Sequence, residues 1–151
     1  MKLGRFLLIY LITAMIMGQL ILSPLAPAVA LPDLPLITLW LVLPNTKLPE
    51  ASGYILLAAA ARELLAVSGF GWRFVAVLAG GYLFYFLAGR LAPDGSASRL
   101  GLAAFLAALA ANLLNQFSPA YIWPIMLSAL ITTLLYLGVL SLKNQLKLGM
   151  S

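Results

Sequence analysis

Long apolar runs separated by short polar breaks constrain this chain more than any other feature. A helix needs roughly 20 apolar residues to cross the hydrocarbon core of a bilayer. Only 9% of the 151 residues are charged, whereas a soluble domain carries about 25%. The sequence therefore predicts an all-α integral membrane protein, a single transmembrane domain (1–151) with six short-looped helices. The expected spans are about 6–22, 31–44, 51–67, 72–89, 100–117 and 121–142.

The first two spans each have an alternative. Lys2, Arg5 and the later Ala28-Val29-Ala30 are typical of a cleaved secretory signal, but the apolar core at 6–22 is longer than the roughly 7–15 residues of a signal. We therefore expect a transmembrane helix there. The uninterrupted apolar part of the second span, 34–43, is too short to cross a core of ~30 Å at about 1.5 Å per residue. A short tilted span and a re-entrant segment both remain open.

The positions of the basic residues predict the orientation. Cytoplasmic loops of membrane proteins carry an excess of Lys and Arg. With six spans and a cytoplasmic N-terminus, the basic residues that fall on the cytoplasmic side are Lys2, Arg5, Lys47, Arg90, Arg99, Lys143 and Lys147. Both termini are thus expected in the cytoplasm. The net charge of +5 then reports orientation and contact with membrane lipids, and we expect no nucleic-acid partner.

Several polar side chains fall in the outer half of this topology and are the candidate site. An ionisable residue at membrane depth costs about 2.5–3.5 kcal/mol on insertion scales and marks a functional candidate. These residues either join helices to each other or form a contact site for a partner helix or a small external ligand. The candidates are Gln19, Asp33, Arg62, Glu63, Arg73, Asn112, Asn115 and Gln116.

Within this set, spacing predicts which side chains share a face. Asn112 and Asn115 are three positions apart, so they lie on one side of their helix. Arg62 and Glu63 are adjacent and point about 100° apart. We therefore expect Glu63 to pair with Arg73 across the intervening turn, or with an amide of the fifth helix.

Small residues and aromatics predict the packing. Ala58 to Ala61, the pair Gly80 and Gly81, and the alanines between positions 103 and 111 are typical of close helix–helix contact in membranes. The aromatic run from Tyr82 to Phe86 is expected to face lipid or to pack between helices.

The residue types present argue against enzyme chemistry. The chain has no cysteine and no histidine, which excludes thiol chemistry and histidine-based triads. Its four carboxylates are Asp33, Glu50, Glu63 and Asp94, and they form no metal-binding or catalytic motif. We expect a non-enzymatic protein without cofactor or metal.

Short motifs, taken in order, resemble those of a known family. The first span ends in GQLILSPLAP and the second opens with Leu31-Pro32-Asp33-Leu34. The third ends in Arg62-Glu63-Leu64-Leu65 before Ser68-Gly69-Phe70-Gly71, and the fourth closes with Tyr82 to Arg90. From about residue 6 to 142 this profile resembles the MreD family of rod shape-determining membrane proteins. Glu63 stands where the family usually has an aspartate.

This resemblance implies a scaffold in the bacterial cytoplasmic (inner) membrane. It would belong to the elongation complex that builds lateral peptidoglycan, with MreC, the MreB filament, and the RodA glycosyltransferase with its transpeptidase as partners. Two alternatives stay open. The chain is also similar to the substrate-binding subunit of an energy-coupling-factor transporter, which has six short-looped spans and an outward pocket. A plain assembly factor for another complex is the third possibility.

Overall fold

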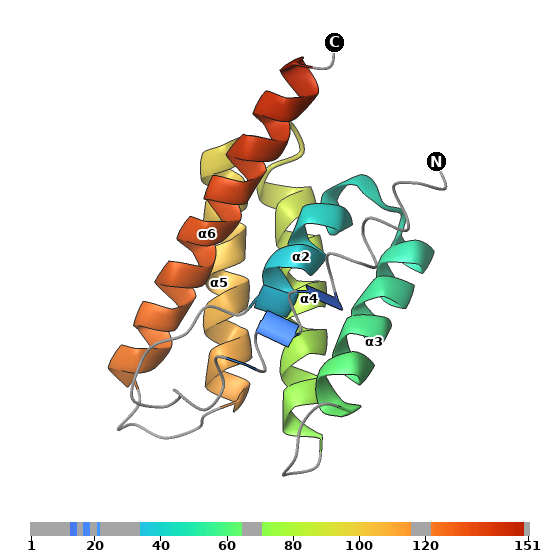
Figure 1. Ribbon diagram of the computed structural model, residues 1–151, viewed down its shortest axis with the longest axis vertical. Coiled ribbons are helices and arrows are strands. Elements are labelled where there is room, and N and C mark those ends of the chain that lie inside the picture. Colours follow the sequence, from blue (N-terminus) through green and yellow to red (C-terminus); the bar gives the residue numbers. More distant parts are fainter. Residues whose placement is uncertain are drawn as a thin grey trace.

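The computed structural model describes residues 34–64, 71–115 and 122–149, with short pieces at 13–14, 17–18 and 21. Within these residues all regular structure is helical, with no strand, which confirms the all-α prediction for this part of the chain (Figure 1). The elements are α2 (Leu34–Val42), the 3₁₀ turn η2 (Leu43–Asn45), α3 (Leu48–Leu64), α4 (Trp72–Leu91), α5 (Ala97–Asn115) and α6 (Ile122–Gly149).

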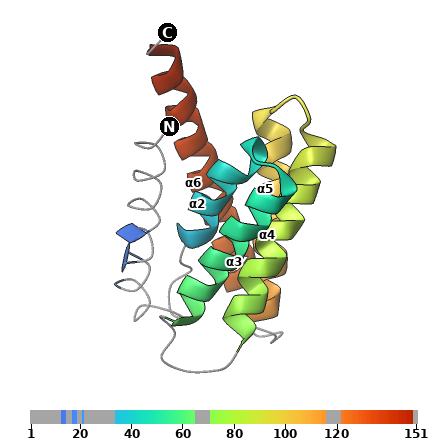
Figure 2. The same cartoon turned by 90° about the vertical axis from the view of Figure 1, so that its right-hand side faces the viewer.

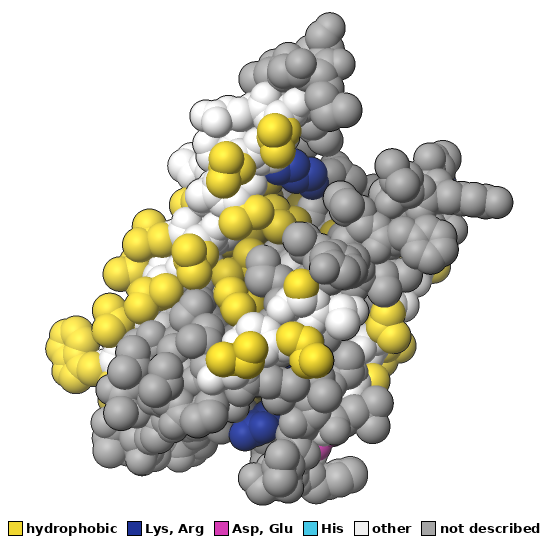
Figure 3. Space-filling model, in the orientation of Figure 1, with side chains coloured by type: hydrophobic (Ala, Val, Ile, Leu, Met, Phe, Trp, Pro, Cys, Tyr) yellow, Lys and Arg dark blue, Asp and Glu magenta, His cyan; other side chains and the backbone are white. Residues whose placement is uncertain are grey.

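Three of the described helices are long and apolar enough to cross a membrane. They are Arg73–Leu91, Ala97–Leu114 and Ile122–Leu146. Between 28% and 39% of the residues in these windows are buried inside the protein, and the others are partly or fully exposed. Figure 3 shows apolar side chains along the outer surface of the molecule, where an aqueous protein would place polar ones. The chain is therefore compatible with a membrane-embedded position.

Four described helix ends lie outside the expected spans, two of them at Leu91 of α4 and Ala97 of α5. Helix α3 begins at Leu48, inside the stretch expected to be a polar break, because Pro49 in a first turn gives up no intrahelical hydrogen bond. Helix α6 continues to Gly149, beyond the expected end at 142. Its added residues include Lys, Leu and Gln, which are good helix formers.

Helices α3 to α6 run alternately up and down, and each packs against the next (Figures 1 and 2). The link between α4 and α5 is short, and its turn uses Gly95 at φ 73°, a left-handed conformation that glycine adopts without strain. Close packing of α4 on α5 uses a row of buried alanines. The buried alanines of α5 are Ala103, Ala104, Ala107, Ala108 and Ala111, which confirms the small-residue prediction.

The short helix α2 lies inside the bundle, against α3, α4 and α6 (Figures 1 and 2). Its nine residues give a length of about 14 Å, less than half of a bilayer core. Leu36, near the start of the helix, and Trp40, in its last turn, both have no exposed surface. Pro44 then falls in η2, where Thr46 bonds the carbonyl of Leu43 through both its amide and its hydroxyl.

An aromatic cluster of Trp40, Phe84 and Tyr136 joins α2, α4 and α6. The Trp40 and Phe84 rings stack with centroids 5.1 Å apart, and Tyr136 meets them edge-on at 5.9 and 5.6 Å. All three side chains are fully buried. The Trp40 indole also donates a hydrogen bond to the carbonyl of Gly80 at 3.3 Å. Of the aromatic run in α4, Phe84 therefore packs inside, whereas Phe86 is exposed.

The pair Gly80 and Gly81 allows α2, α3 and α5 to approach α4. A Cβ atom on Gly81 would lie 3.0 Å from Ile55 and 3.1 Å from Leu39. A Cβ on Gly80 would lie 3.2 Å from both Leu36 and Ala111. These distances are shorter than ordinary contacts of about 3.5–4.0 Å, so the helices can sit this close only because both positions are glycine.

Candidate functional site

Glu63 closes the gap between two consecutive helices. Its Oε1 accepts a hydrogen bond from the Gly71 amide at 2.8 Å, and its Oε2 accepts one from the Phe74 amide at 3.2 Å. Gly71 has φ 81° and precedes the first residue of α4. The first amides of a helix have no intrahelical acceptor, and a carboxylate there is favoured by the helix dipole. Glu63 thus acts as a helix cap contributed by the preceding helix.

This role differs from the ion pair expected from the sequence. Arg73 lies in the first turn of α4 and its side chain is exposed. No ion pair between Glu63 and Arg73 occurs, although both residues are within the described part of the chain. Arg62 is half-buried in the last turn of α3. The charged candidates of α3 and α4 therefore gather at one end of the bundle, but Glu63 bonds the backbone.

Asn112 makes a contact between helices. Its side-chain amide donates to the Ser128 hydroxyl at 3.4 Å, which links α5 to α6. The length of this bond places it at the weak end of the range for hydrogen bonds. Asn112 is half-buried. Asn112 therefore contacts a neighbouring helix, which is one of the two roles considered for this set of residues.

The side chains of four of the predicted site residues cannot be placed from the described part of the chain. Asn115 is the last residue of α5, and its side chain lies outside the described part. Gln19, Asp33 and Gln116 also lie outside the described residues. No group of three or more acidic residues in the described part could hold a metal ion.

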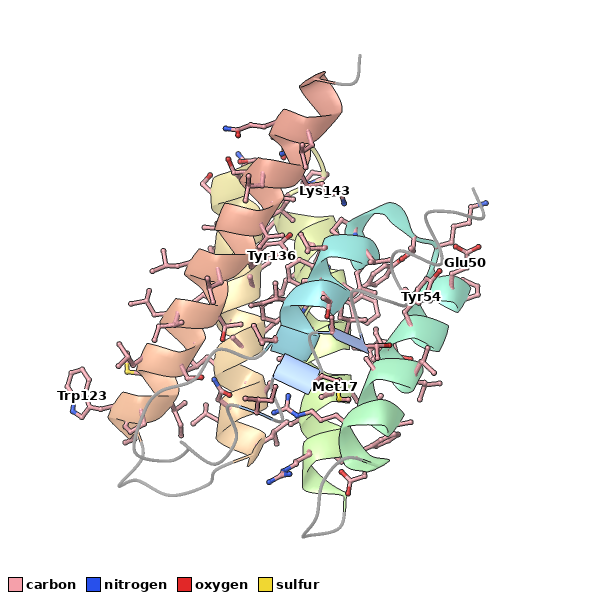
Figure 4. All side chains as sticks on the ribbon, in the orientation of Figure 1. Met17, Glu50, Tyr54, Trp123, Tyr136 and Lys143 are labelled. Atoms are coloured by element: carbon pink, nitrogen blue, oxygen red, sulfur yellow. The ribbon has the colours of Figure 1, made fainter. Side chains whose placement is uncertain are left out.

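The opposite end of the bundle holds a contact that the sequence did not indicate. The Lys143 ammonium on α6 donates to the carbonyl of Leu41 at 3.0 Å, near the end of α2. Carbonyls in the last turn of a helix lack intrahelical donors, and a cation there is favoured by the dipole. Figure 4 shows Lys143 and Tyr136 on the same helix, with Lys143 nearer the C-terminal end of α6. Lys143 therefore fastens α2 to α6.

Three of the described polar contacts join parts of the bundle to each other. Glu63 caps α4, Asn112 joins α5 to α6, and Lys143 joins α6 to α2. No family model, no curated protein and no solved structure matches this chain. A function must therefore be inferred from its residues and their geometry.

Replacing Glu63 with glutamine is expected to lower the free energy of unfolding by about 1–3 kcal/mol, because hydrogen bonds to a charged group are stronger than neutral ones. Glutamine also offers one acceptor oxygen where the carboxylate offers two. Unfolding in detergent by titration with sodium dodecyl sulfate gives the value. The matched control is Glu50→Gln in the first turn of α3, where an exposed charge contributes at most about 1 kcal/mol. Equal effects at the two positions would contradict the capping role.

Proposed function

We propose that the protein is a non-enzymatic membrane scaffold of the bacterial cell-elongation complex, acting in lateral peptidoglycan synthesis at the cytoplasmic membrane. It crosses the membrane six times with both termini in the cytoplasm. Its proposed partners are MreC, the MreB filament, and the RodA glycosyltransferase with its transpeptidase. The resemblance of its motifs to the MreD family supplies this biological setting.

One observation supports a scaffold best: Glu63 and Asn112 are engaged within the bundle, while many outward positions are apolar. Glu63 and Asn112 each bind another part of the same chain. Outward positions on the helices carry large apolar residues instead, such as Leu57 on α3, Leu106 on α5 and Leu134 on α6. A protein built this way offers partners its apolar helix faces.

The distribution of charge supports the proposed orientation. Lys47, Arg90, Arg99 and Lys143 lie at the end of the bundle where α2 and α4 finish and α5 begins (Figure 1). Among the described residues, the other end holds Arg62 and Arg73, with Glu63 beside them. The positive-inside rule places the more basic end in the cytoplasm. The second crossing in this proposal combines α2 with neighbouring residues, since α2 alone is too short.

The energy-coupling-factor alternative predicts a different use of the same end. A substrate-binding subunit would present polar groups at its outer end to a small molecule. Both carboxylate oxygens of Glu63 instead accept hydrogen bonds from backbone amides at the start of α4. A ligand would have to compete with these bonds, so this arrangement favours the scaffold.

The test is a native purification. The tagged protein is extracted from its own membranes in mild detergent, and the proteins and small molecules that accompany it are identified by mass spectrometry. We expect MreC or the cell-wall synthase. In a panel of single variants, Leu57→Trp, Leu106→Trp and Leu134→Trp, at least one should reduce that recovery at least fivefold without changing the unfolding midpoint, because these side chains point outward.

The control in this panel is Trp40→Phe, an internal change that leaves the helix faces intact and should not change recovery from the folded protein. Recovery of a stoichiometric small molecule together with an ATPase-coupled partner would overturn the scaffold and support the transporter alternative. Recovery of neither partner class, with all variants behaving alike, would also contradict the proposal.

A further inference from the structure

A cavity of about 590 Å³ opens at the basic end of the bundle. One wall is the last turns of α4, with Tyr85, Phe86, Gly89 and Arg90, and the opposite wall includes Thr46 after η2. The Tyr85 hydroxyl donates to the Thr46 carbonyl at 3.3 Å and joins the two walls. The candidate span on α4 ends at Leu91, so the cavity lies at the level where the hydrocarbon core gives way to headgroups.

The wall on α4 presents an apolar ring and, one turn further along the helix, a positive charge. Phe86 and Arg90 are four positions apart, so they lie on one face of the helix, one turn from each other. Phe86 is 55% exposed, and Arg90, a turn nearer the end of the helix, is exposed as well. Arg90 forms no ion pair within the described part of the chain. A ligand that fits this wall has an apolar portion followed by an anion.

The carboxylate that also lines the cavity is balanced by a second arginine. Asp94 lies 3.9 Å from the Arg99 guanidinium, and both side chains are about 60% exposed. Asp94 also accepts a hydrogen bond from the Ser96 amide at 3.4 Å. The charges of Asp94 and Arg99 offset each other. Arg90 therefore gives the site an excess of one positive charge.

We propose that this cavity binds one anionic phospholipid, with its phosphate at Arg90 and its acyl chain along Phe86. The guanidinium of arginine matches a phosphate with two parallel hydrogen bonds. Basic pockets at the cytoplasmic side of membrane helices bind anionic headgroups in the same way. This site is separate from the scaffold function, since it needs only that the bundle lies in a membrane.

A larger side chain at position Gly89 would fill part of the cavity without disturbing the fold. Nothing lies within 4 Å of a Cβ atom built on this residue, and leucine is a better helix former than glycine. A leucine there takes up cavity space beside Arg90. Gly53 on α3 is the matched control, since it is also exposed in a helix with nothing within 4 Å and does not line the cavity.

The experiment titrates the full-length protein in detergent with dioctanoyl phosphatidylglycerol, and native mass spectrometry measures the fraction that carries lipid. Arg90→Gln should weaken binding about fivefold, the effect of about 1 kcal/mol per basic residue. Gly89→Leu should also weaken it, whereas Gly53→Leu should not. Dioctanoyl phosphatidylcholine, which carries no net charge, should bind more weakly than phosphatidylglycerol.

Three results would overturn the site. The first is equal binding of the two lipids, and the second is binding that neither Arg90→Gln nor Gly89→Leu reduces. The third is displacement of phosphatidylglycerol by inorganic phosphate at similar concentration, which would assign the cavity to a free anion. Each of these results leaves the recovery of protein partners untouched, so the site and the scaffold can fail independently.

Discussion

Replacing Trp40 with alanine is expected to lower the free energy of unfolding by about 3–5 kcal/mol, the range for truncating a large buried aromatic residue. Trp40 is fully buried and contacts both Phe84 and Tyr136. Its removal leaves a void at the point where α2, α4 and α6 meet. It also removes the hydrogen bond that the Trp40 indole donates to the Gly80 carbonyl.

The absence of cysteine in the chain provides the measurement. A single cysteine introduced at Ala104, which is fully buried, reacts with a maleimide only when the bundle opens, so its labelling during detergent titration reports unfolding. The matched control is Trp123→Ala. That side chain is 80% exposed and points away from the bundle (Figure 4), so its removal should change stability by less than about 0.5 kcal/mol. A similar loss of stability in Trp40→Ala and Trp123→Ala would contradict the described core.

Substitution of Gly81 by alanine is expected to destabilise the bundle by about 1–3 kcal/mol through overpacking. The added methyl group would approach Ile55 to 3.0 Å and Leu39 to 3.1 Å. Either α3 or α2 must then shift away from α4. The effect is opposite in sign to the usual preference for alanine over glycine in a helix, which is worth roughly 0.5–1 kcal/mol.

The control for this substitution is Gly138→Ala on α6. Nothing lies within 4 Å of a Cβ atom at this position, so alanine should leave stability unchanged or raise it slightly. The same cysteine-labelling assay compares the two variants. A stabilising effect at Gly81 would show that α2 and α3 do not lie as close to α4 as the structure places them.

The sequence predicts the helices and their close contacts well, because both depend on local residue types. Long apolar runs locate α4, α5 and α6, and small residues mark the α4 face at Gly80 and Gly81. The same reasoning singled out Glu63 as unusual, since a charge within an apolar run is costly. The sequence predicts a charged or amide side chain as the partner of Glu63. It misses the actual partners, because backbone amides at the start of α4 cannot be recognised from residue types.

Contacts between distant parts of the chain could not be predicted in this way. Trp40, Phe84 and Tyr136 come from three helices, and no local pattern pairs them. The apolar run 34–43 indicated a short second helix, but its place in the fold stayed open, because such a run is compatible with a tilted span and with a re-entrant segment. The structure gives it nine residues inside the bundle.

The bond from Lys143 to the Leu41 carbonyl has a consequence for the order of assembly during synthesis. The donor lies on α6 and the acceptor on α2, so the ribosome completes α3, α4 and α5 before this bond can form. Tyr136, which covers Trp40, is also on α6. Until that helix inserts, α2 lacks the neighbour that covers one side of it. The contacts that α6 makes with α2 therefore form only after α3, α4 and α5 have been made, and until then the side of Trp40 that Tyr136 covers stays open.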